Sequence, residues 1–72
     1  MDENKEYRGL AAIGIRLNRS RDTIRKFLNP EYCKKMGMTI LPAAKVGREW
    51  WITERSIIAW LERNVQALGL EA

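Results

Sequence analysis

The spacing of apolar residues predicts two short helices in the first half of the chain. Small or apolar residues recur at helical intervals over residues 10–17, at Leu10, Ile13, Gly14 and Leu17. A second helix is expected over residues 20–28, with Ser20 as its N-terminal cap and an apolar face made by Ile24, Phe27 and Leu28. Asn18 suits the end of the first helix, because asparagine tolerates the left-handed conformation. Two helices joined by so tight a turn form a helix-turn-helix, while residues 1–8 are expected to be a flexible N-terminus.

Gly14 has a specific role in this interpretation. A glycine within a helix costs roughly 1 kcal/mol relative to alanine. Such a cost is tolerable where a second helix must pack closely against the position. We therefore expect the second helix to lie against Gly14.

A change of hydrophobic period predicts a β-hairpin over residues 43–53. A two-residue turn would place a glutamate on the apolar face. A three-residue loop instead pairs Val46 with Trp50 and Ala44 with Ile52, which gives one apolar face, so we expect the three-residue loop. This register turns three side chains outward: Lys45, Arg48 and Trp51.

The remaining segments complete a fold that is mostly α with a small β-hairpin. Residues 30–37 can form one or two helical turns that stop at Gly37. The last helix is expected over residues 54–68, capped by Thr53. Its buried stripe comprises Ile57, Leu61, Val65 and Leu68, joined by Trp60.

Positive charge is concentrated in the middle of the chain. The 72 residues carry a formal net charge of +4. From Arg19 to Arg48 there are eight basic residues and two acidic ones, whereas residues 1–18 balance and residues 49–72 are net acidic. Such segregation favours a polyanionic partner, most often nucleic acid.

The sequence lacks the residues that several other functional classes require. There is no histidine, and Cys33 is the only cysteine, which excludes an internal disulfide, a Cys/His zinc site and histidine-based triads. The glycines do not form a phosphate-cradling loop, and no apolar run approaches the ~20 residues of a membrane span. We expect a cytoplasmic protein that is not an enzyme, without metal, cofactor, membrane or small-molecule substrate.

Two stretches carry a family resemblance, LNRSRDTIRKFL (17–28) and LPAAKVGREWWITERSIIAWLE (41–62). Together they resemble the turn, recognition helix, wing and closing helix of the excisionase-like and MerR-like winged helix-turn-helix DNA-binding families. The resemblance implies one winged helix-turn-helix domain over residues 9–72. Three departures are visible: Arg19 replaces an aliphatic turn residue, Trp51 stands where an arginine is frequent, and the link over residues 29–39 is long.

The resemblance also implies which residues contact DNA. In the family arrangement the second helix enters the major groove with its N-terminal residues at the base edges. Ser20, Arg21, Asp22 and Arg25 would lie near bases, and Thr23 and Lys26 near phosphates. Alternatively, Arg21 and Arg25 are solvated helix charges, one of them paired with Asp22.

In the wing, Lys45, Gly47 and Arg48 would reach the adjacent DNA backbone or the minor groove. Trp51 would contact sugar and backbone or form part of a protein interface. The alternative is a hairpin whose charges only keep its turn soluble. For Arg19, Lys34 and Lys35 two interpretations remain, added phosphate contacts or simple solvation.

The expected function is binding of double-stranded DNA as a transcription regulator or recombination directionality factor of phage or mobile-element origin. One module buries little surface, so homodimers or cooperative arrays are expected, with residues 54–72 as a place of self-association. Two alternatives remain: the DNA-recognition domain of a phage terminase small subunit, or a protein-interaction module that uses Trp51 and the last helix. RNA binding is less favoured, because no aromatic stacking platform is evident.

Overall fold

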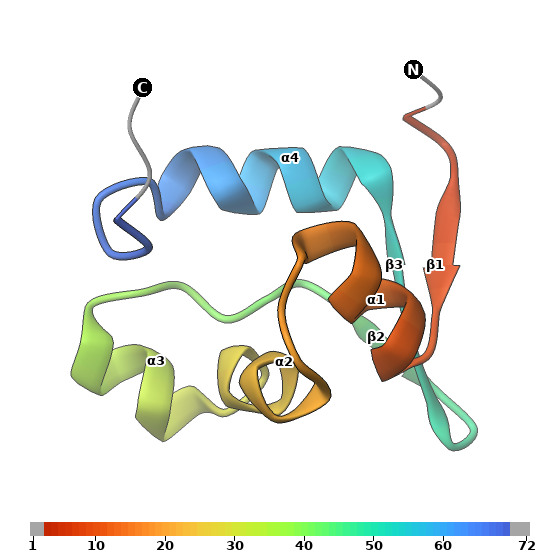
Figure 1. Ribbon diagram of the computed structural model, residues 1–72, viewed down its shortest axis with the longest axis horizontal. Coiled ribbons are helices and arrows are strands. Elements are labelled where there is room, and N and C mark those ends of the chain that lie inside the picture. The colour runs from red at the N-terminus through yellow and green to blue at the C-terminus, as the bar shows by residue number, and fades with distance from the viewer. Residues whose placement is uncertain (1–2, 70–72) are drawn as a thin grey trace.

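Four helices and a three-stranded antiparallel sheet make up the structure, a computed structural model that describes residues 3–69. In chain order the elements are β1 (Glu6–Arg8), α1 (Leu10–Leu17), α2 (Arg21–Phe27), α3 (Pro30–Met36), β2 (Ala44–Val46), β3 (Glu49–Thr53) and α4 (Glu54–Arg63). The strand order is β1-β3-β2, so the first strand pairs with the last. Figure 1 shows α4 along the top, α2 and α3 below it, and the sheet at the right-hand end.

Local signals account for the end of α1 and for the starts of α2 and α3. The Ser20 hydroxyl accepts a hydrogen bond from the Thr23 amide (3.2 Å) and so caps α2, as predicted. Asn18 ends α1 in the left-handed conformation, with φ 56°. The link contains a complete helix, α3, because the Asn29 side chain caps it and Pro30 occupies its first turn.

The last helix is shorter than predicted and ends at Arg63 instead of residue 68. The cause is Asn64, whose side chain is 2% exposed. Its Oδ1 accepts from the Thr39 amide (2.8 Å), and its Nδ2 donates to the Thr39 hydroxyl (2.9 Å) and the Trp60 carbonyl (2.6 Å). These bonds fix Asn64 to the link before β2 and turn the chain out of the helix.

The expected flexible segment 1–8 contains a strand, so the expectation fails for Glu6–Arg8. β1 pairs with β3 in the register Glu6–Thr53, Tyr7–Ile52 and Arg8–Trp51. The strand is too short to produce a recognisable alternation. Pairing with a distant partner, not local sequence, determines it.

The predicted hairpin register is wrong. Val46 pairs with Glu49 and Lys45 with Trp50, which leaves a two-residue turn at Gly47 and Arg48. Gly47 has φ 63°, a conformation that glycine adopts readily at the first central position of a tight hairpin turn. The prediction assumed that the hairpin buries one face only. In the structure β3 is the central strand, so Trp50 and Trp51 both pack, on opposite faces of the sheet.

The core lies between α1, α2, α4 and the inner face of the sheet. Its buried members are Ile13, Ile24, Phe27, Leu41, Ile52, Ile57 and Trp60. The predicted core position of Trp60 is confirmed: its ring lies 5.2 Å from that of Phe27, and its indole N–H donates to the Thr39 carbonyl (2.8 Å). This core orients α2 with its opposite side toward solvent.

A buried ion pair connects the N-terminal strand, α1 and α4. Glu54 is 1% exposed, and its carboxylate accepts two hydrogen bonds from the Arg16 guanidinium (2.6 and 2.5 Å) and one from the Tyr7 hydroxyl (2.8 Å). The bonds from Arg16, opposed by burial, lower the pKa of Glu54 from 4.5 to about 2. Glu54 is therefore charged under all ordinary conditions.

Gly14 lies where α1 meets the turn into α2, as expected. A Cβ at this position would be 2.7 Å from the Arg19 carbonyl oxygen and 3.8 Å from Ile24. We predict that Gly14→Ala lowers the free energy of unfolding by about 1–3 kcal/mol, because overpacking against backbone outweighs the roughly 1 kcal/mol gain in helix propensity. Urea denaturation would measure the change.

The matched control for this prediction is Ala11→Gly in the same helix. Ala11 is exposed, so only the propensity term acts and the expected loss is about 1 kcal/mol. A Gly14→Ala variant more stable than the parent protein would contradict the close approach.

Candidate nucleic-acid interface

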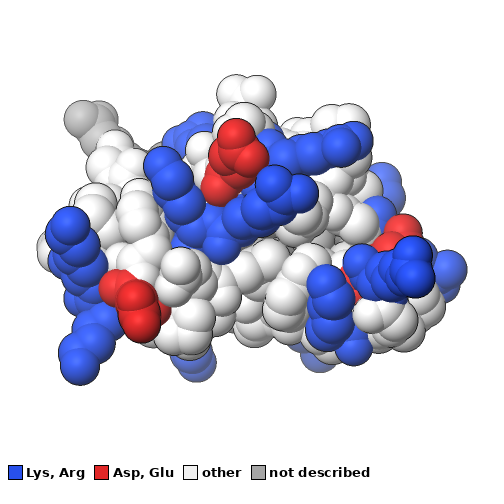
Figure 2. Space-filling model, turned by 90° about the horizontal axis from the view of Figure 1, so that it is seen from below, with Lys and Arg blue, Asp and Glu red and all other residues white. Residues whose placement is uncertain are grey.

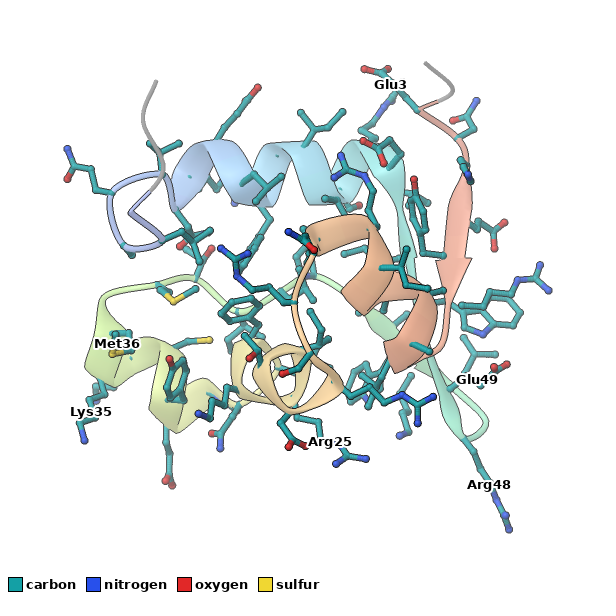
Figure 3. The ribbon with its side chains drawn as sticks, in the orientation of Figure 1. Glu3, Arg25, Lys35, Met36, Arg48 and Glu49 are labelled. Carbon is teal, nitrogen blue, oxygen red and sulfur yellow. The ribbon has the colours of Figure 1, made fainter. Side chains whose placement is uncertain are left out.

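A basic cleft of about 650 Å³ lies between the start of α1, the exposed side of α2 and the β2–β3 hairpin. Half of its lining residues are basic: Arg8, Arg21, Arg25, Lys45 and Arg48. One acidic residue, Glu49, accompanies them. Figure 2 shows the face seen from below, where blue Lys and Arg side chains gather in several groups on a largely uncharged surface and exceed the red acidic ones. In Figure 3 Arg25 lies below α2 and Arg48 at the hairpin tip, both on the side opposite Glu3.

The packing of α2 places two arginines in the cleft. Ile24 and Phe27 are buried, so the opposite side of α2 faces solvent. Arg21 and Arg25 are four residues apart and therefore adjacent on the helix surface. Arg25 pairs with Asp22 at 3.4 Å, but both side chains are more than half exposed, 66% and 86%. Such a pair contributes at most about 1 kcal/mol, so the Arg25 guanidinium is available to another anion.

The hairpin supplies the opposite wall. Lys45 is paired with Trp50 across the strands, and its ammonium lies 4.9 Å from the centre of that ring. Arg48 occupies the second turn position and is exposed. The predicted wing residues Lys45 and Arg48 thus join the predicted helix residues Arg21 and Arg25 around one cleft, although these pairs are about twenty residues apart in sequence.

Arg8 borders the cleft at the edge of the sheet, a position that the sequence patterns did not reveal, and its side chain lies on the same face of the sheet as Trp51. It ends β1, and its guanidinium lies 4.2 Å from the centre of the Trp51 ring. Glu6 on the same strand is 3.6 Å away. The one signal in the sequence is Glu6-Tyr7-Arg8 followed by glycine, a three-residue alternation that is too short to predict a strand.

Glu49 reduces the cleft's positive charge at one wall. A carboxylate oxygen of Glu49 lies 3.5 Å from the position that a Cβ would take at Gly9, the residue before α1. No side chain caps α1, so the acid sits beside the positive end of the helix dipole, where a carboxylate is favoured. Five basic residues remain against this one acid.

Trp51 does not line the cleft with the other predicted wing residues. It lies on the opposite face of the sheet from Trp50, beneath Arg8, and it lines a separate hollow with Pro42 and Ala44. Its indole N–H is buried, so it cannot reach a phosphate in this arrangement. The incorrect hairpin register is the reason that Trp51 was grouped with Lys45 and Arg48.

The remaining predicted contacts are not among the residues that line the cleft. The hydroxyls of Ser20 and Thr23 are hydrogen-bonded to each other (3.0 Å), and Ser20 serves as a cap. The Lys26 ammonium lies 5.8 Å from the Tyr32 ring centre. The Arg19 guanidinium donates to the Asn18 carbonyl (3.0 Å). Lys34 and Lys35 are exposed on α3, and Figure 3 shows Lys35 at the far end of the same side from Arg48.

The arrangement can bind an anion that is longer than a single phosphate, because its charges come from three separate segments, β1, α2 and the hairpin. Within residues 3–69 no three His, Cys, Asp or Glu side chains gather as a metal site requires. None of the helices in that part of the chain has the length and apolar character needed to cross a membrane.

Comparison with protein-family models, with curated proteins and with solved structures gave no match.

Proposed function

We propose that the protein is a winged helix-turn-helix domain that binds double-stranded DNA with sequence specificity. The observation that carries the proposal is the cleft in which Arg21 and Arg25 of α2 stand opposite Lys45 and Arg48 of the hairpin. In this proposal α1, α2 and their turn form the helix-turn-helix, and β2–β3 is the wing. α2 enters the major groove, and the hairpin lies against the neighbouring backbone or minor groove.

Two side-chain properties favour a DNA duplex over other polyanions. Arginine can donate two hydrogen bonds to O6 and N7 of guanine, and Arg21 and Arg25 are exposed on a helix that is narrow enough for the major groove. RNA-binding modules commonly stack unpaired bases on exposed aromatic rings. Here the Trp50 and Trp51 rings are half-buried, and each lies against a cationic side chain.

The cellular role follows from the resemblance in the two quoted stretches. We propose a transcription regulator or a recombination directionality factor of phage or mobile-element origin, acting by binding without bond chemistry. The terminase small-subunit alternative uses the same fold and the same cleft, and would differ in the DNA site selected. The protein-interaction alternative was based on Trp51 and the last helix; the observation that favours it is a different residue, Ile15 of α1, which is 83% exposed.

The salt dependence of binding tests the proposal directly. Fluorescence anisotropy with a labelled duplex of randomised sequence, titrated at several salt concentrations, gives the slope of log K against log salt. Each neutralised phosphate contributes about −0.9 to this slope, so three or more contacts from the cleft should give about −3 or steeper. No binding at low salt would contradict the proposal.

Arg48→Ala is the variant that connects this slope to the cleft. We expect it to weaken binding to all duplexes alike and to reduce the slope by about 1, because Arg48 would contact phosphate from the hairpin tip. Arg63→Ala removes the same charge at the end of α4, away from the hairpin (Figure 1). If both variants reduced the affinity and the slope equally, the binding would depend on the net charge of the protein and not on the cleft.

A further inference from the structure

The outer edge of β1 has unused hydrogen-bonding capacity. The Gly9 amide donates to the Trp50 carbonyl, and the Glu54 amide donates to the Lys5 carbonyl, both at 2.8 Å. In an antiparallel ladder, alternate residues bond to the neighbouring strand. The backbone groups of Glu6 and Arg8 therefore point away from β3. No other strand within residues 3–69 covers them, and Figure 1 shows β1 at the right-hand side of the molecule, with β3 on its inner side.

The side chains on this edge are self-complementary. If a second β1 pairs antiparallel about Tyr7, Glu6 of one copy lies opposite Arg8 of the other, and the reverse pair forms at the same time. Both positions point their backbone groups outward, so these two pairs would also be hydrogen-bonded. Opposite charges directly across an antiparallel pair stabilise it, whereas like charges destabilise it. Within one copy the Glu6–Arg8 pair is long, 3.6 Å, and exposed.

An apolar surface adjoins the same edge. Ile15 of α1 is 83% exposed, more than any other large apolar side chain in the described part of the chain. It lines a hollow of about 600 Å³ together with Tyr7, Ala12 and Arg16. A two-fold axis perpendicular to the sheet keeps α1 of both copies on one face. The two Ile15 side chains would then approach each other above the joined strands.

We propose that the protein forms a homodimer through antiparallel pairing of β1 with β1 of a second copy. The sheet becomes continuous across both copies, with the Glu6–Arg8 pairs on one face and the α1 helices on the other. The occupant of this edge is a second copy because, in this register, Glu6 and Arg8 of one copy lie opposite residues of opposite charge in the other. This interface differs from residues 54–72, where self-association was expected. It does not depend on DNA binding.

Charge reversal provides the test, measured by sedimentation equilibrium without DNA. The unmodified protein should show a monomer–dimer equilibrium. Glu6→Arg alone and Arg8→Glu alone should each weaken the dimer by at least ~10-fold, since both cross-strand pairs become repulsive. An equimolar mixture of the two variants should restore a dimer, because each Arg–Arg strand then faces a Glu–Glu strand. Restoration by mixing separates a lost interface from a damaged fold.

Ile15→Asp is an independent variant on the helix side of the interface. The side chain is exposed in the monomer, so circular dichroism should show a folded protein, while the dimer should weaken at least ~10-fold through loss of apolar contact and like-charge approach. Ile40→Asp is the matched control, because Ile40 is exposed in the link before β2. It should leave the dimer unchanged.

Two results would overturn the proposal. One is a purely monomeric protein at concentrations of hundreds of micromolar, in which case Glu6 and Arg8 keep the edge unpaired, as charged residues do on other edge strands. The other is a dimer that Glu6→Arg leaves intact, which would assign self-association to another surface. Neither result bears on duplex binding, so failure here is distinguishable from failure of the proposed function.

Discussion

Glu54→Gln should lower the free energy of unfolding by about 3 kcal/mol, a large part of the stability of so small a domain. Glutamine has nearly the same shape but no charge, so Arg16 keeps its partly buried position and loses its charged partner. Breaking a buried ion pair on one side costs about 3–5 kcal/mol. The lower end applies because the Arg16 side chain is 26% exposed and can be partly hydrated. Urea denaturation at neutral pH would measure the change.

The pH dependence of stability gives a second signature of the same side chain. The pKa of Glu54 is lowered from 4.5 to about 2 by its hydrogen bonds from Arg16 and Tyr7. A depressed carboxyl pKa contributes stability that is complete above the unfolded value and is lost as the pH falls toward the folded value. Stability should therefore decline between about pH 4.5 and 2, and Glu54→Gln should flatten that part of the profile.

Glu62→Gln is the matched control on the same helix. Glu62 is exposed, so its replacement should change stability by no more than about 0.5 kcal/mol. If Glu54→Gln were equally mild, the ion pair would not hold β1 and α1 against α4. The ion pair also helps to position Arg8 beside the cleft. Tyr7, the residue before Arg8, donates a hydrogen bond to Glu54 (2.8 Å) and so holds β1 in place.

Replacing both Arg21 and Arg25 by alanine should reduce affinity for the preferred DNA site by about 100-fold or more. A good bidentate contact from arginine to guanine contributes about 1–3 kcal/mol of discrimination, and two such contacts are removed. Affinity for randomised duplex should fall much less, because only the loss of two charges acts there. Site selection followed by anisotropy on the selected and randomised duplexes would measure both effects.

The matched control for this pair is Lys34→Ala with Lys35→Ala, which removes two charges from the exposed surface of α3. If these lysines contact phosphate, the selected and randomised duplexes should lose affinity equally. An equal loss for the arginine pair would mean that Arg21 and Arg25 also serve only as charges. In that case specificity would have to come from DNA shape or from the hairpin.

Local sequence was sufficient for the helices around the cleft. Ser20 and Asn18 determine where α2 begins and α1 ends through bonds to residues no more than four positions away. The spacing of Ile24 and Phe27 turns Arg21 and Arg25 outward, so helical periodicity alone was enough to infer their shared exposed side. The fold was also predicted at the level of a mostly helical protein with a hairpin.

Tertiary structure alone decided the addition of β1 to the sheet, the hairpin register, the end of α4 and the membership of the cleft. β1 exists because β3 pairs with it, and Arg8 reaches the cleft through that pairing. The hairpin register depends on β3 being the central strand, which sends Trp50 and Trp51 to different faces. Capping and helical periodicity act within one or two helical turns, so neighbouring residues are enough to predict them. The burial of Glu54 depends on partners 38 and 47 residues away, and β1 pairs with residues at a similar distance along the chain, so only the folded chain brings them together.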